Sequence, residues 1–445
     1  GTGPIPLMVP TDSCEELSMS SNTFPRKNRK NSTSEREGTI IYTLTARFSH
    51  IYDSGGRVSL FSDSHVFSNE IWQRYLAIFD EMILAVRSRP TSQIDKRALY
   101  EVTGKGVHVA PLPYFEGPLQ FLVKYWAIRK KLKRTLETFP RASLTARLPC
   151  PIGFLMIGII KNKRPYAVEV VGDPWEVFSP EGVKHILRPF LRRFFRVRQR
   201  RACRDAIGAI YVSNYLQERY PCKNMSIIST NIQLNRDDYS SRSRRYDNEK
   251  RTFSLIFVGT LQQLYKAPDI LIKAVSICVG RGYDVRLTLL GDGKYRNYLE
   301  KLANELGIKS RVEFKGSVPR EEVFRSLDEA DLFVLPSKTE GLPRAMLEAM
   351  ARGLPCIGST AGGIPEILHE EDVVPPGDAD ALAEKIMEVL SCPERMSAMS
   401  ERNLSRAKDY SEDILQKKRE EFYLDVREKT EDYFADCQKR EESMG

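Results

Sequence analysis

The 445-residue sequence lacks a long apolar segment, closely paired cysteines and an even distribution of charge. Its longest apolar run, Pro151–Ile160, has about half the length that a helix needs to cross a bilayer, so we expect no membrane-spanning helix. The eight cysteines are scattered without a C-x-x-C pair, which argues against a zinc site and favours a reducing cytoplasm. Residues 1–37 have no apolar core of the secretory type and are rich in polar residues, which predicts a disordered leader.

Acidic residues are scarce in one region. From Phe121 to Arg204 there are 20 Lys or Arg residues against 5 Asp or Glu, a local charge of +15 in a chain whose net charge is +9. The run from Lys184 to Arg204 has nine basic residues and no acid. Within it, apolar residues recur at helical spacing: Leu187, Phe190, Leu191, Phe194 and Val197. This pattern is typical of a core stripe with a solvated back, and also of a helix lying on an anionic membrane.

The order of apolar patterns predicts two α/β domains. Short β-type runs alternate with helical ones, including a helix over 118–139, and a polar stretch then interrupts this rhythm near Asn235. We therefore expect an N-terminal Rossmann-like domain over 38–235 and a C-terminal one over 236–411. Residues 412–445 predict one or two charged helices that fold back over the first domain. In the second domain strand and helix alternate five times, which indicates a doubly wound parallel sheet that binds ligands beyond its carboxyl edge.

One stretch of the second domain, "TEGLPRAMLEAMARGLP", carries two acids eight positions apart, Glu340 and Glu348. We expect a helix that begins near Leu342, with Pro343 in its first turn. An acid about five residues inside that helix, at a rise of roughly 7–8 Å, is placed to accept hydrogen bonds from a sugar hydroxyl. The alternative is a solvated loop acid followed by an exposed helix acid, and the spacing alone does not decide between them.

The start of this helix predicts a binding site for an anion. Its first backbone N–H groups, near Arg344 and Ala345, have no partners within the helix and lie at the positive end of its dipole. Glu340 would face the same crevice from the preceding loop. The geometry suits a nucleotide diphosphate-sugar.

These residues belong to a larger likeness. The chain resembles the retaining glycosyltransferases of family 4, whose GT-B architecture sets two Rossmann-like domains face to face, through "FVGTLQQLYKAPDILIKAV", "LTLLGDG", "VEFKGSVP", "ADLFVLPSKTEGLPRAMLEAMARGLPCIGSTAGGIPEIL" and "VPPGDADALAEKI". The first domain matches more loosely, through "YAVEVVGDPWEVF" and "YVSNYLQERYP", and looks like the bacterial surface-polysaccharide branch. The resemblance implies an α/β GT-B fold with doubly wound parallel sheets. It also implies transfer of a hexosyl unit to an acceptor hydroxyl with retention, in polysaccharide or glycolipid biosynthesis.

The resemblance implies roles for individual residues. Glu348 matches the acid that holds the nucleotide ribose, and Glu340 the acid near the donor sugar. Lys266 matches the lysine that neutralises the diphosphate and, with Glu340, belongs to the expected catalytic set. Gly259 matches the glycine that lets the donor approach, and Val318 falls where the backbone meets the base. The other positions expected at the donor are Thr260, Gly291, Gly341, Leu342, Arg344 and Ala345.

Two positions depart from the family pattern. Thr260 stands where the family usually has an arginine, so we hypothesise that Arg344 supplies the missing contact to the diphosphate. In the first domain, Gly172 or Asp173 takes the place of a histidine that many relatives have. Asp173 is therefore a catalytic candidate for contact with the transferred sugar, and the alternative is that it caps the turn before Pro174.

Other polar patterns are weaker. Asp378 and Asp380 resemble a metal-binding Asp-x-Asp pair, but an Asp directly before a helix is an ordinary N-cap. We expect no metal, and no cofactor besides the nucleotide diphosphate-sugar co-substrate. Gly55 and Gly56 either approach the donor or the acceptor from the first domain, or form a simple turn.

The expected partners follow from these predictions. They are a nucleotide-sugar donor, a glycan or lipid-linked acceptor, and an anionic membrane surface bound through the basic run from Lys184 to Arg204. No nucleic-acid recognition motif accompanies the basic residues, so we expect no nucleic-acid partner. We expect a cytoplasmic enzyme, peripheral on the inner face of the membrane. Two other function classes share the fold: a nucleotide-sugar epimerase and a non-catalytic nucleotide-sugar-binding protein.

Overall fold

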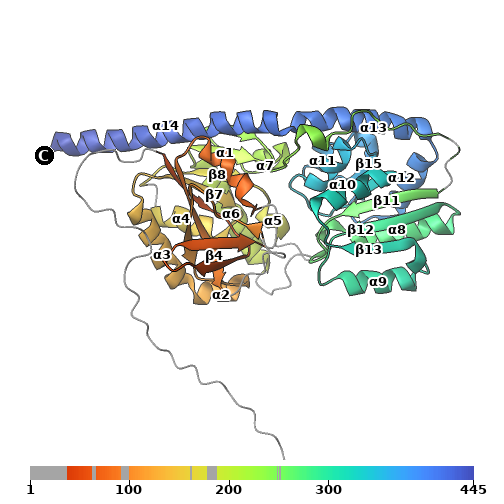
Figure 1. The fold of residues 1–445 in the computed structure, drawn as a ribbon, viewed down its shortest axis with the longest axis horizontal. Coiled ribbons are helices and arrows are strands. Elements are labelled where there is room, and N and C mark those ends of the chain that lie inside the picture. The colour runs from red at the N-terminus through yellow and green to blue at the C-terminus, as the bar shows by residue number, and fades with distance from the viewer. Residues whose placement is uncertain are drawn as a thin grey trace, which may run out of the picture.

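The computed structural model describes residues 38–62, 67–91, 100–160, 163–177, 188–247, 249 and 252–444. They form two α/β halves that lie side by side, and the last helix runs along the N-terminal half (Figure 1). The expected leader, residues 1–37, lies outside the described residues. So does the start of the basic run, residues 184–187.

The N-terminal half is built on a ten-stranded sheet of order β10-β9-β8-β7-β1-β4-β2-β3-β5, in which β6 also pairs with β4. The strands are β1 (Thr39–Thr43), β2 (Phe48–Tyr52), β3 (Val58–Ser62), β4 (Glu81–Pro90), β5 (Tyr100–Glu101), β6 (Val107–Leu112), β7 (Ser143–Leu148), β8 (Ala167–Val170), β9 (Gly208–Tyr211) and β10 (Met225–Ile228). The central pairs are parallel, as predicted. At one edge, β2 pairs antiparallel with β3, and β3 with β5, which the alternation of strand and helix did not predict.

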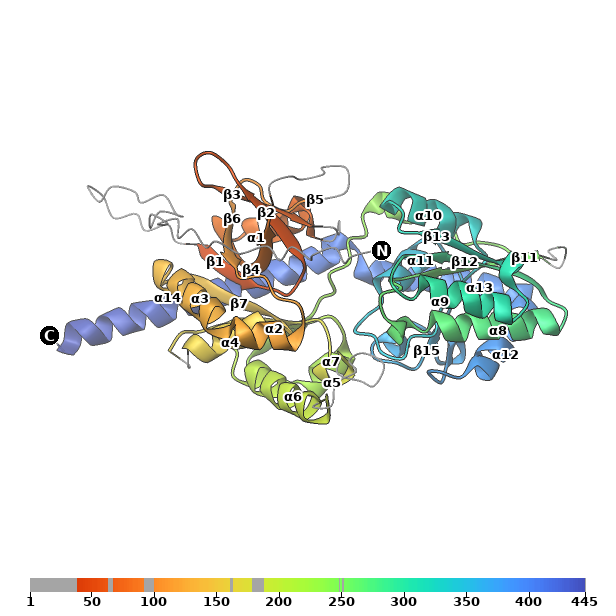
Figure 2. The ribbon, with the colours of Figure 1, turned by 90° about the horizontal axis from the view of Figure 1, so that it is seen from below.

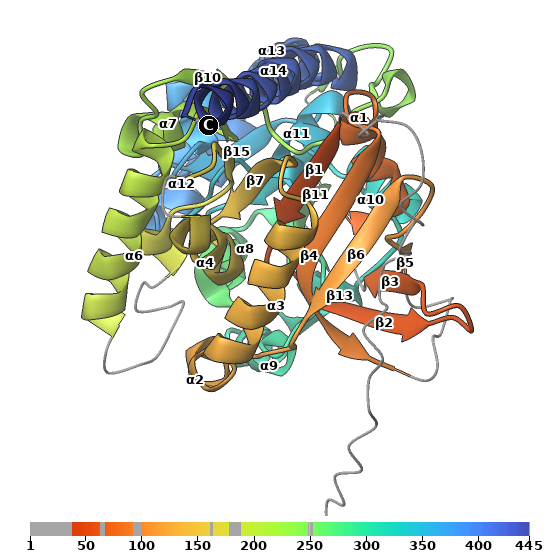
Figure 3. The same cartoon turned by 90° about the vertical axis from the view of Figure 1, so that its left-hand side faces the viewer.

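Helices cover both faces of this sheet. They are α1 (Gln73–Leu76), α2 (Gly117–Val123), α3 (Tyr125–Thr138), α4 (Pro151–Ile160), α5 (Pro174–Val177), α6 (Arg188–Arg204) and α7 (Asn214–Arg219), with the 3-10 turn η2 (Asn69–Trp72) before α1. Side chains alternate along each strand, so Ile41 packs in one core with α3 and α4, whereas Tyr42 packs in the other with α1 and the last helix. Figure 3 shows α3, α4 and α6 together on one side of the strands.

The single helix expected over 118–139 is wrong, because two helices meet at Lys124. The dihedral ψ of Lys124 is 4°, which ends α2, and its ammonium group donates a hydrogen bond of 2.7 Å to the carbonyl of Tyr114. The helix α3 then turns Ile128 and Leu132 toward the sheet. Tertiary contact thus overrides a continuous helical pattern.

The C-terminal half has a six-stranded sheet of order β13-β12-β11-β14-β15-β16, and every pair in it is parallel. Its strands are β11 (Thr252–Val258), β12 (Asp284–Leu290), β13 (Val312–Gly316), β14 (Leu332–Leu335), β15 (Cys356–Ser359) and β16 (Val373–Val374). Its helices are α8 (Pro268–Gly280), α9 (Arg296–Glu305), α10 (Arg320–Glu329), α11 (Arg344–Ala351), α12 (Ala379–Leu390) and α13 (Pro393–Ala407). This confirms the doubly wound parallel sheet.

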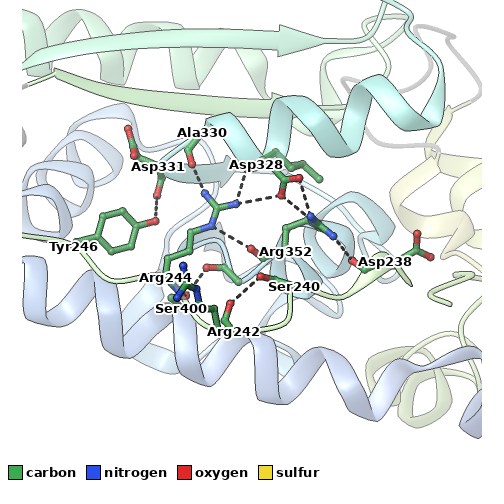
Figure 4. A network of polar contacts seen from close by, with 12 residues as sticks. Asp238, Ser240, Arg242, Arg244, Tyr246, Asp328, Ala330, Asp331, Arg352 and Ser400 are labelled. Carbon is green, nitrogen blue, oxygen red and sulfur yellow. Dashed lines mark hydrogen bonds and ion pairs between the residues drawn. The ribbon is translucent and has the colours of Figure 1, made fainter. Parts of the chain in front are cut away.

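The segment between the two halves is held against the C-terminal half (Figure 4). Arg244 donates hydrogen bonds to the carbonyls of Leu327 and Arg352, at 2.8 and 3.1 Å. Arg352 in turn pairs with both carboxylate oxygens of Asp328, at 2.7 and 2.8 Å. Asp238, earlier in the segment, accepts two hydrogen bonds from Arg320. The segment therefore packs against the second half from Asp238 onward, and the domain boundary between residues 235 and 236 stays a prediction.

The last helix, α14 (Glu412–Met444), returns to the N-terminal half (Figure 2). Its Tyr423 hydroxyl donates a hydrogen bond of 2.5 Å to Glu169 on β8, a carboxylate that also accepts hydrogen bonds from Tyr42 and Tyr75. A buried carboxylate is tolerated when hydrogen bonds satisfy it, so these three phenols account for Glu169. None of the helices in the described ranges is long and apolar enough to span a membrane.

Candidate functional site

The predicted acids lie at the carboxyl edge of the second sheet. Strand β14 ends at Leu335, a loop carries Glu340, and α11 follows with Glu348 in its second turn. The helix begins at Arg344, two residues later than predicted, and Pro343 is its N-cap rather than part of its first turn. The reason is that the N–H groups of Met346 and Leu347 bond to the carbonyl of Pro343. The N–H groups of Arg344 and Ala345 precede these bonds, as an anion site requires.

Lys266 and Glu340 form an ion pair across the site. Lys266 ends a 3-10 turn after β11, and its Nζ lies 2.9 Å from Oε2 of Glu340, with both side chains about one-eighth exposed. Ser337 donates a second hydrogen bond to the same oxygen at 3.2 Å. Burial opposes the charge of Lys266, yet the negative charge of Glu340 raises its pKa above the usual value. A lysine so held is fully protonated and positioned to neutralise an anion.

Glycines make room for this arrangement. A Cβ on Gly259 would lie 2.5 Å from the side chain of Lys266, so the glycine leaves the lysine its place. Gly291 has a φ of +135°, and a Cβ there would lie 1.9 Å from the carbonyl oxygen of Gly259. The ends of β11 and β12 therefore approach more closely than any side chain would allow. Thr260 follows with an exposed side chain, whose hydroxyl accepts a hydrogen bond from the N–H of Gln262 at 3.2 Å.

Glu348 and Arg344 line a cavity of about 330 Å³ between the two halves. Its wall includes Glu70 and Tyr100 from the first half and Arg320 from α10. Burial raises the pKa of Glu348, and the charges of Arg344 and Arg320 oppose that rise. The two residues that we expect at the ribose and the diphosphate thus share one cavity.

The remaining donor positions lie in the two loops beside this cavity. Val318 is half-buried between β13 and α10, and Leu342 is buried just before α11. The backbone of Gly341 lies against the other half: a Cβ at this position would be only 2.8 Å from the carbonyl oxygen of Val171. The carbonyl of Gly341 accepts a hydrogen bond of 3.0 Å from the N–H of Gly363. Of the predicted donor residues, Gly341, Arg344 and Glu348 therefore lie where the two halves meet.

Asp173, the candidate from the first half, is 2% exposed and already engaged. One carboxylate oxygen accepts hydrogen bonds from the Tyr220 hydroxyl and from the N–H of Trp175, the latter at 2.8 Å. The other oxygen pairs with Arg219 at 2.5 Å. These are the contacts of the capping alternative, and contact with the transferred sugar stays a prediction.

Gly55 and Gly56 lie in the turn that joins β2 and β3. The N–H of Gly55 donates to the Asp53 side chain at 2.9 Å, that of Gly56 donates to the Asp53 carbonyl at 3.0 Å, and Gly56 has a φ of +77°. The hairpin turn is sufficient reason for both glycines. Contact with a donor or acceptor stays a prediction.

Two acids that the sequence reasoning missed lie at the junction. Glu366 accepts hydrogen bonds from the backbone N–H groups of Asn214 and Tyr215, at 2.8 and 2.7 Å, and so caps α7 of the other half. Glu176 accepts a hydrogen bond of 2.9 Å from the Tyr215 hydroxyl. Burial raises the pKa of Glu176 to about 7, and the negative charges of Asp173 and Glu340 add to the rise. Neither role has a signal in the sequence beyond an acid near a strand end, because their partners are distant along the chain.

The predicted N-cap is confirmed: the Asp378 side chain accepts a hydrogen bond of 2.9 Å from the N–H of Ala381 at the start of α12. Across the part of the chain that the structure describes, no group of three or more His, Cys, Asp or Glu side chains is arranged to hold a metal ion.

Comparisons with known proteins agree with this architecture. Residues 240–406 match the family model of the glycosyl transferases group 1. The chain is 28% identical to protein CapJ of Staphylococcus aureus over 381 residues, which cover 83% of this chain and 92% of that protein. It is 35% identical over 143 residues to the GDP-mannose-dependent monoacylated alpha-(1-6)-phosphatidylinositol monomannoside mannosyltransferase of Corynebacterium glutamicum, covering 30% of this chain and 37% of that enzyme.

A solved structure extends the likeness to the whole fold. The crystal structure of HepE from Anabaena in complex with UDP-glucose superposes with a TM-score of 0.60 at 17% identity, covering 86% of this chain and 98% of that one. Both halves and their arrangement are therefore of the GT-B type. Residues 240–406, which carry most of the motifs of the resemblance, thus match the glycosyl transferases group 1, and the described chain as a whole has the GT-B fold.

Proposed function

We propose that the protein transfers a hexosyl unit, with retention, from a nucleotide diphosphate-sugar to an acceptor hydroxyl in polysaccharide or glycolipid biosynthesis. The observation that carries the proposal is the 2.9 Å pair of Lys266 and Glu340 beside the free N–H groups of α11. A diphosphate that leaves a sugar gains negative charge. Lys266 and the N–H groups of Arg344 and Ala345 would stabilise that charge in the transition state.

The other donor residues would orient the molecule. Glu348 would accept hydrogen bonds from the ribose hydroxyls, and Arg344, which shares its cavity, would bind the diphosphate in place of the arginine that Thr260 replaces. Glu340 would hold the sugar hydroxyls once the diphosphate attracts Lys266. The leaving diphosphate itself would take the proton of the acceptor hydroxyl on the same face of the sugar. The close approach of Gly341 to Val171 supports a closed crevice that excludes water.

We propose that the reaction needs no metal ion, because Lys266, Arg344 and the end of α11 supply positive charge at the diphosphate. The acceptor would bind mainly to the N-terminal half, where Glu176 lies close enough to Glu340 for the two charges to interact. The relatives differ in their donors, since one is named for GDP-mannose and another was solved with UDP-glucose. Both nucleotides therefore belong in the test.

We propose that the enzyme is cytoplasmic and peripheral on the inner face of the membrane, through the basic run from Lys184 to Arg204. In α6, Phe190, Phe194 and Val197 are exposed by 66, 43 and 44%, so these residues of the predicted stripe do not serve as core. Arg193, Arg200 and Arg201 of the same helix are also exposed. An exposed apolar stripe flanked by arginines favours the membrane alternative. Binding to anionic vesicles that weakens with added salt is the expected result.

A panel of nucleotide diphosphate-sugars tests the donor site. The matching donor should raise the Tm of the protein, and Lys266→Ala should reduce that rise, whereas Lys301→Ala on the exposed face of α9 should not. Release of free nucleotide diphosphate should need an acceptor and should persist in a chelator. Stabilisation without turnover would favour a non-catalytic binding protein. Release of an epimeric sugar without an acceptor would favour an epimerase. If no donor stabilises the protein, the assignment of the donor site is refuted.

A further inference from the structure

The helix α2 and the first turn of α3 carry a group of apolar side chains that the protein leaves in solvent. Leu119, Leu122, Val123 and Trp126, which we name the α2–α3 ledge, are exposed by 69, 65, 83 and 73%. No residue of α2 is buried. Soluble proteins rarely expose large apolar side chains as a contiguous group unless the group contacts something.

The ledge has a firm base. Phe121 is the residue of α2 that turns inward, and its ring lies 5.0 Å from that of Phe115 and 6.1 Å from that of Tyr125. The next helix, α3, buries Ile128 and Leu132 against the sheet. The ledge is therefore presented by anchored helices, and its exposure does not result from a failure to pack.

The charges around the ledge are of one sign. From Leu119 to Arg134 the sequence has six Lys or Arg residues and no Asp or Glu. The guanidinium of Arg129 lies 5.8 Å from the centre of the Trp126 ring, and the ammonium of Lys124 is tied to the carbonyl of Tyr114. Apolar side chains with a tryptophan, surrounded by basic residues, have the composition of a segment that lies in the interface of an anionic bilayer.

The ledge lies on the same side of the molecule as α6. Figures 2 and 3 both show α2, α3, α4 and α6 on one side of the first sheet. Arg198 of α6 donates a hydrogen bond of 2.8 Å to the carbonyl of Phe154 in α4, and its guanidinium lies 5.4 Å from the Phe154 ring. The helix that exposes Phe190 and Phe194 therefore packs on α4, on the side of the sheet that carries the ledge.

We propose that the α2–α3 ledge inserts into an anionic lipid bilayer and anchors the N-terminal half on it. The inference rests on the proposed use of a lipid-linked acceptor, since it brings the acceptor-binding half to the surface where such an acceptor resides. It adds a second apolar contact to the apolar and electrostatic contacts proposed for α6. Added salt therefore weakens the electrostatic part of membrane binding, whereas salt does not remove the apolar part, to which the ledge contributes.

Trp126 is a probe within the ledge. Of the three tryptophans, Trp72 is 1% exposed and Trp175 is covered by the guanidinium of Arg192 at 3.8 Å, whereas Trp126 is largely in solvent. Vesicles of phosphatidylcholine with phosphatidylglycerol should shift the fluorescence emission to shorter wavelength and protect it from acrylamide. Vesicles of phosphatidylcholine alone should do so far less. In Trp126→Phe the shift should disappear while flotation with vesicles remains.

The double variant Leu122→Ser/Val123→Ser should lower the affinity for the anionic vesicles about tenfold or more, by removing two apolar contacts with lipid. The matched control is Ile414→Ser/Leu424→Ser on α14, whose side chains are 43 and 48% exposed. Both variants should keep the Tm of the parent and its stabilisation by a donor. If no donor stabilises the parent, the donor site is refuted, and the vesicle affinities of the two variants still decide for or against the ledge.

Two results would overturn the proposal. One is vesicle binding with Trp126 still accessible to acrylamide and with equal affinity in the double variant, which would assign binding to α6 alone. The other is a parent protein that sediments as a dimer and a double variant that sediments as a monomer, which would assign the ledge to a second copy of the chain. A blue shift of Trp126 together with weaker binding of the double variant supports insertion.

Discussion

The two sides of the crevice are built by different means. On the C-terminal side the backbone itself forms the site: Gly291 lies against the carbonyl of Gly259, and Gly362 lies so close to the carbonyl of Glu340 that a Cβ would be 1.6 Å from it. On the N-terminal side, side chains bond to one another, as Asp173 does with Tyr220 and Glu176 with Tyr215. A backbone-built surface tolerates few substitutions, whereas a side-chain network can change its members. This difference suits the proposal that the C-terminal half binds the nucleotide and the N-terminal half binds the acceptor.

The largest expected effect comes from a substitution that disturbs the close backbone contacts on the C-terminal side of the crevice. Gly291→Ala places a Cβ 1.9 Å from the Gly259 carbonyl at a φ of +135°, so the ends of β11 and β12 must separate. We expect a loss of about 3–5 kcal/mol in the free energy of unfolding from strain and overpacking together. Urea denaturation measures it. Gly280→Ala, where nothing lies within 4 Å of the new Cβ, is the matched control, and an equal effect of the two would refute the close approach.

The next effect concerns the lysine that this backbone accommodates. Lys266→Ala removes the cation from the diphosphate, and we expect kcat/KM to fall by about 10²–10³-fold, as for loss of a group that stabilises charge in a transition state. Steady-state kinetics with the matching donor measures it. A similar fall in Lys301→Ala, on the far surface of α9, would contradict a specific role.

The third effect concerns the departure at Thr260. Arg344→Ala should weaken donor binding by about tenfold, because a hydrogen bond between charged groups contributes about 1.5–3 kcal/mol. Isothermal titration with the donor measures the change. Arg325→Ala, an exposed arginine on α10, is the control. Unchanged affinity in Arg344→Ala would show that another residue replaces the family's arginine.

The smallest effect belongs to the side-chain network. The pKa of Glu176 is raised to about 7, so between its ordinary value of 4.5 and that value the native state holds more protons than the unfolded chain. Its contribution to stability is complete below the ordinary pKa and is lost as the pH rises through 7. The variant Glu176→Gln has no titrating group at this position. Its free energy of unfolding relative to that of the parent should therefore rise by about 1 kcal/mol from pH 5 to pH 8, after allowance for partial exposure.

Thermal unfolding checks this last prediction. The Tm of Glu176→Gln minus that of the parent should increase by about 2–4 °C from pH 5 to pH 8. The groups that face Glu176 are Tyr215 and Arg219 on α7, Asp173 before α5, Arg192 on α6 and Glu340 across the crevice. A constant difference in Tm over this range would show that Glu176 titrates like an ordinary carboxyl.

The sequence predicts the second half well because its information is local. The central strands β14 and β15 are buried along their whole length, so their apolar runs predict them directly. The cap at Asp378 follows from one residue and the helix after it. The observed start of α11 is two residues later than the predicted one, because the hydrogen bonds to the carbonyl of Pro343, rather than the residue type, define where the helix begins.

The structure of the first half is harder to predict from the sequence, because contacts between residues far apart along the chain determine it. The antiparallel strands β2, β3 and β5 follow no alternation with helices, and the break at Lys124 depends on Tyr114. The stripe of Phe190, Phe194 and Val197 has the period of a core face, yet the helix buries Gln199, Ala202 and Cys203 instead. Periodicity reports that a face is apolar, and the rest of the chain determines what covers it.

The return of α14 to the first half sets the order in which the protein can be completed during synthesis. Glu169 leaves the ribosome long before Tyr423, which donates to it from a position 254 residues later. Phe422, the neighbour of that tyrosine, fills the space beside Gly208 in the same half. The core of the C-terminal half therefore does not depend on these side chains, whereas the N-terminal half, which is made first, waits for α14 before its core is closed.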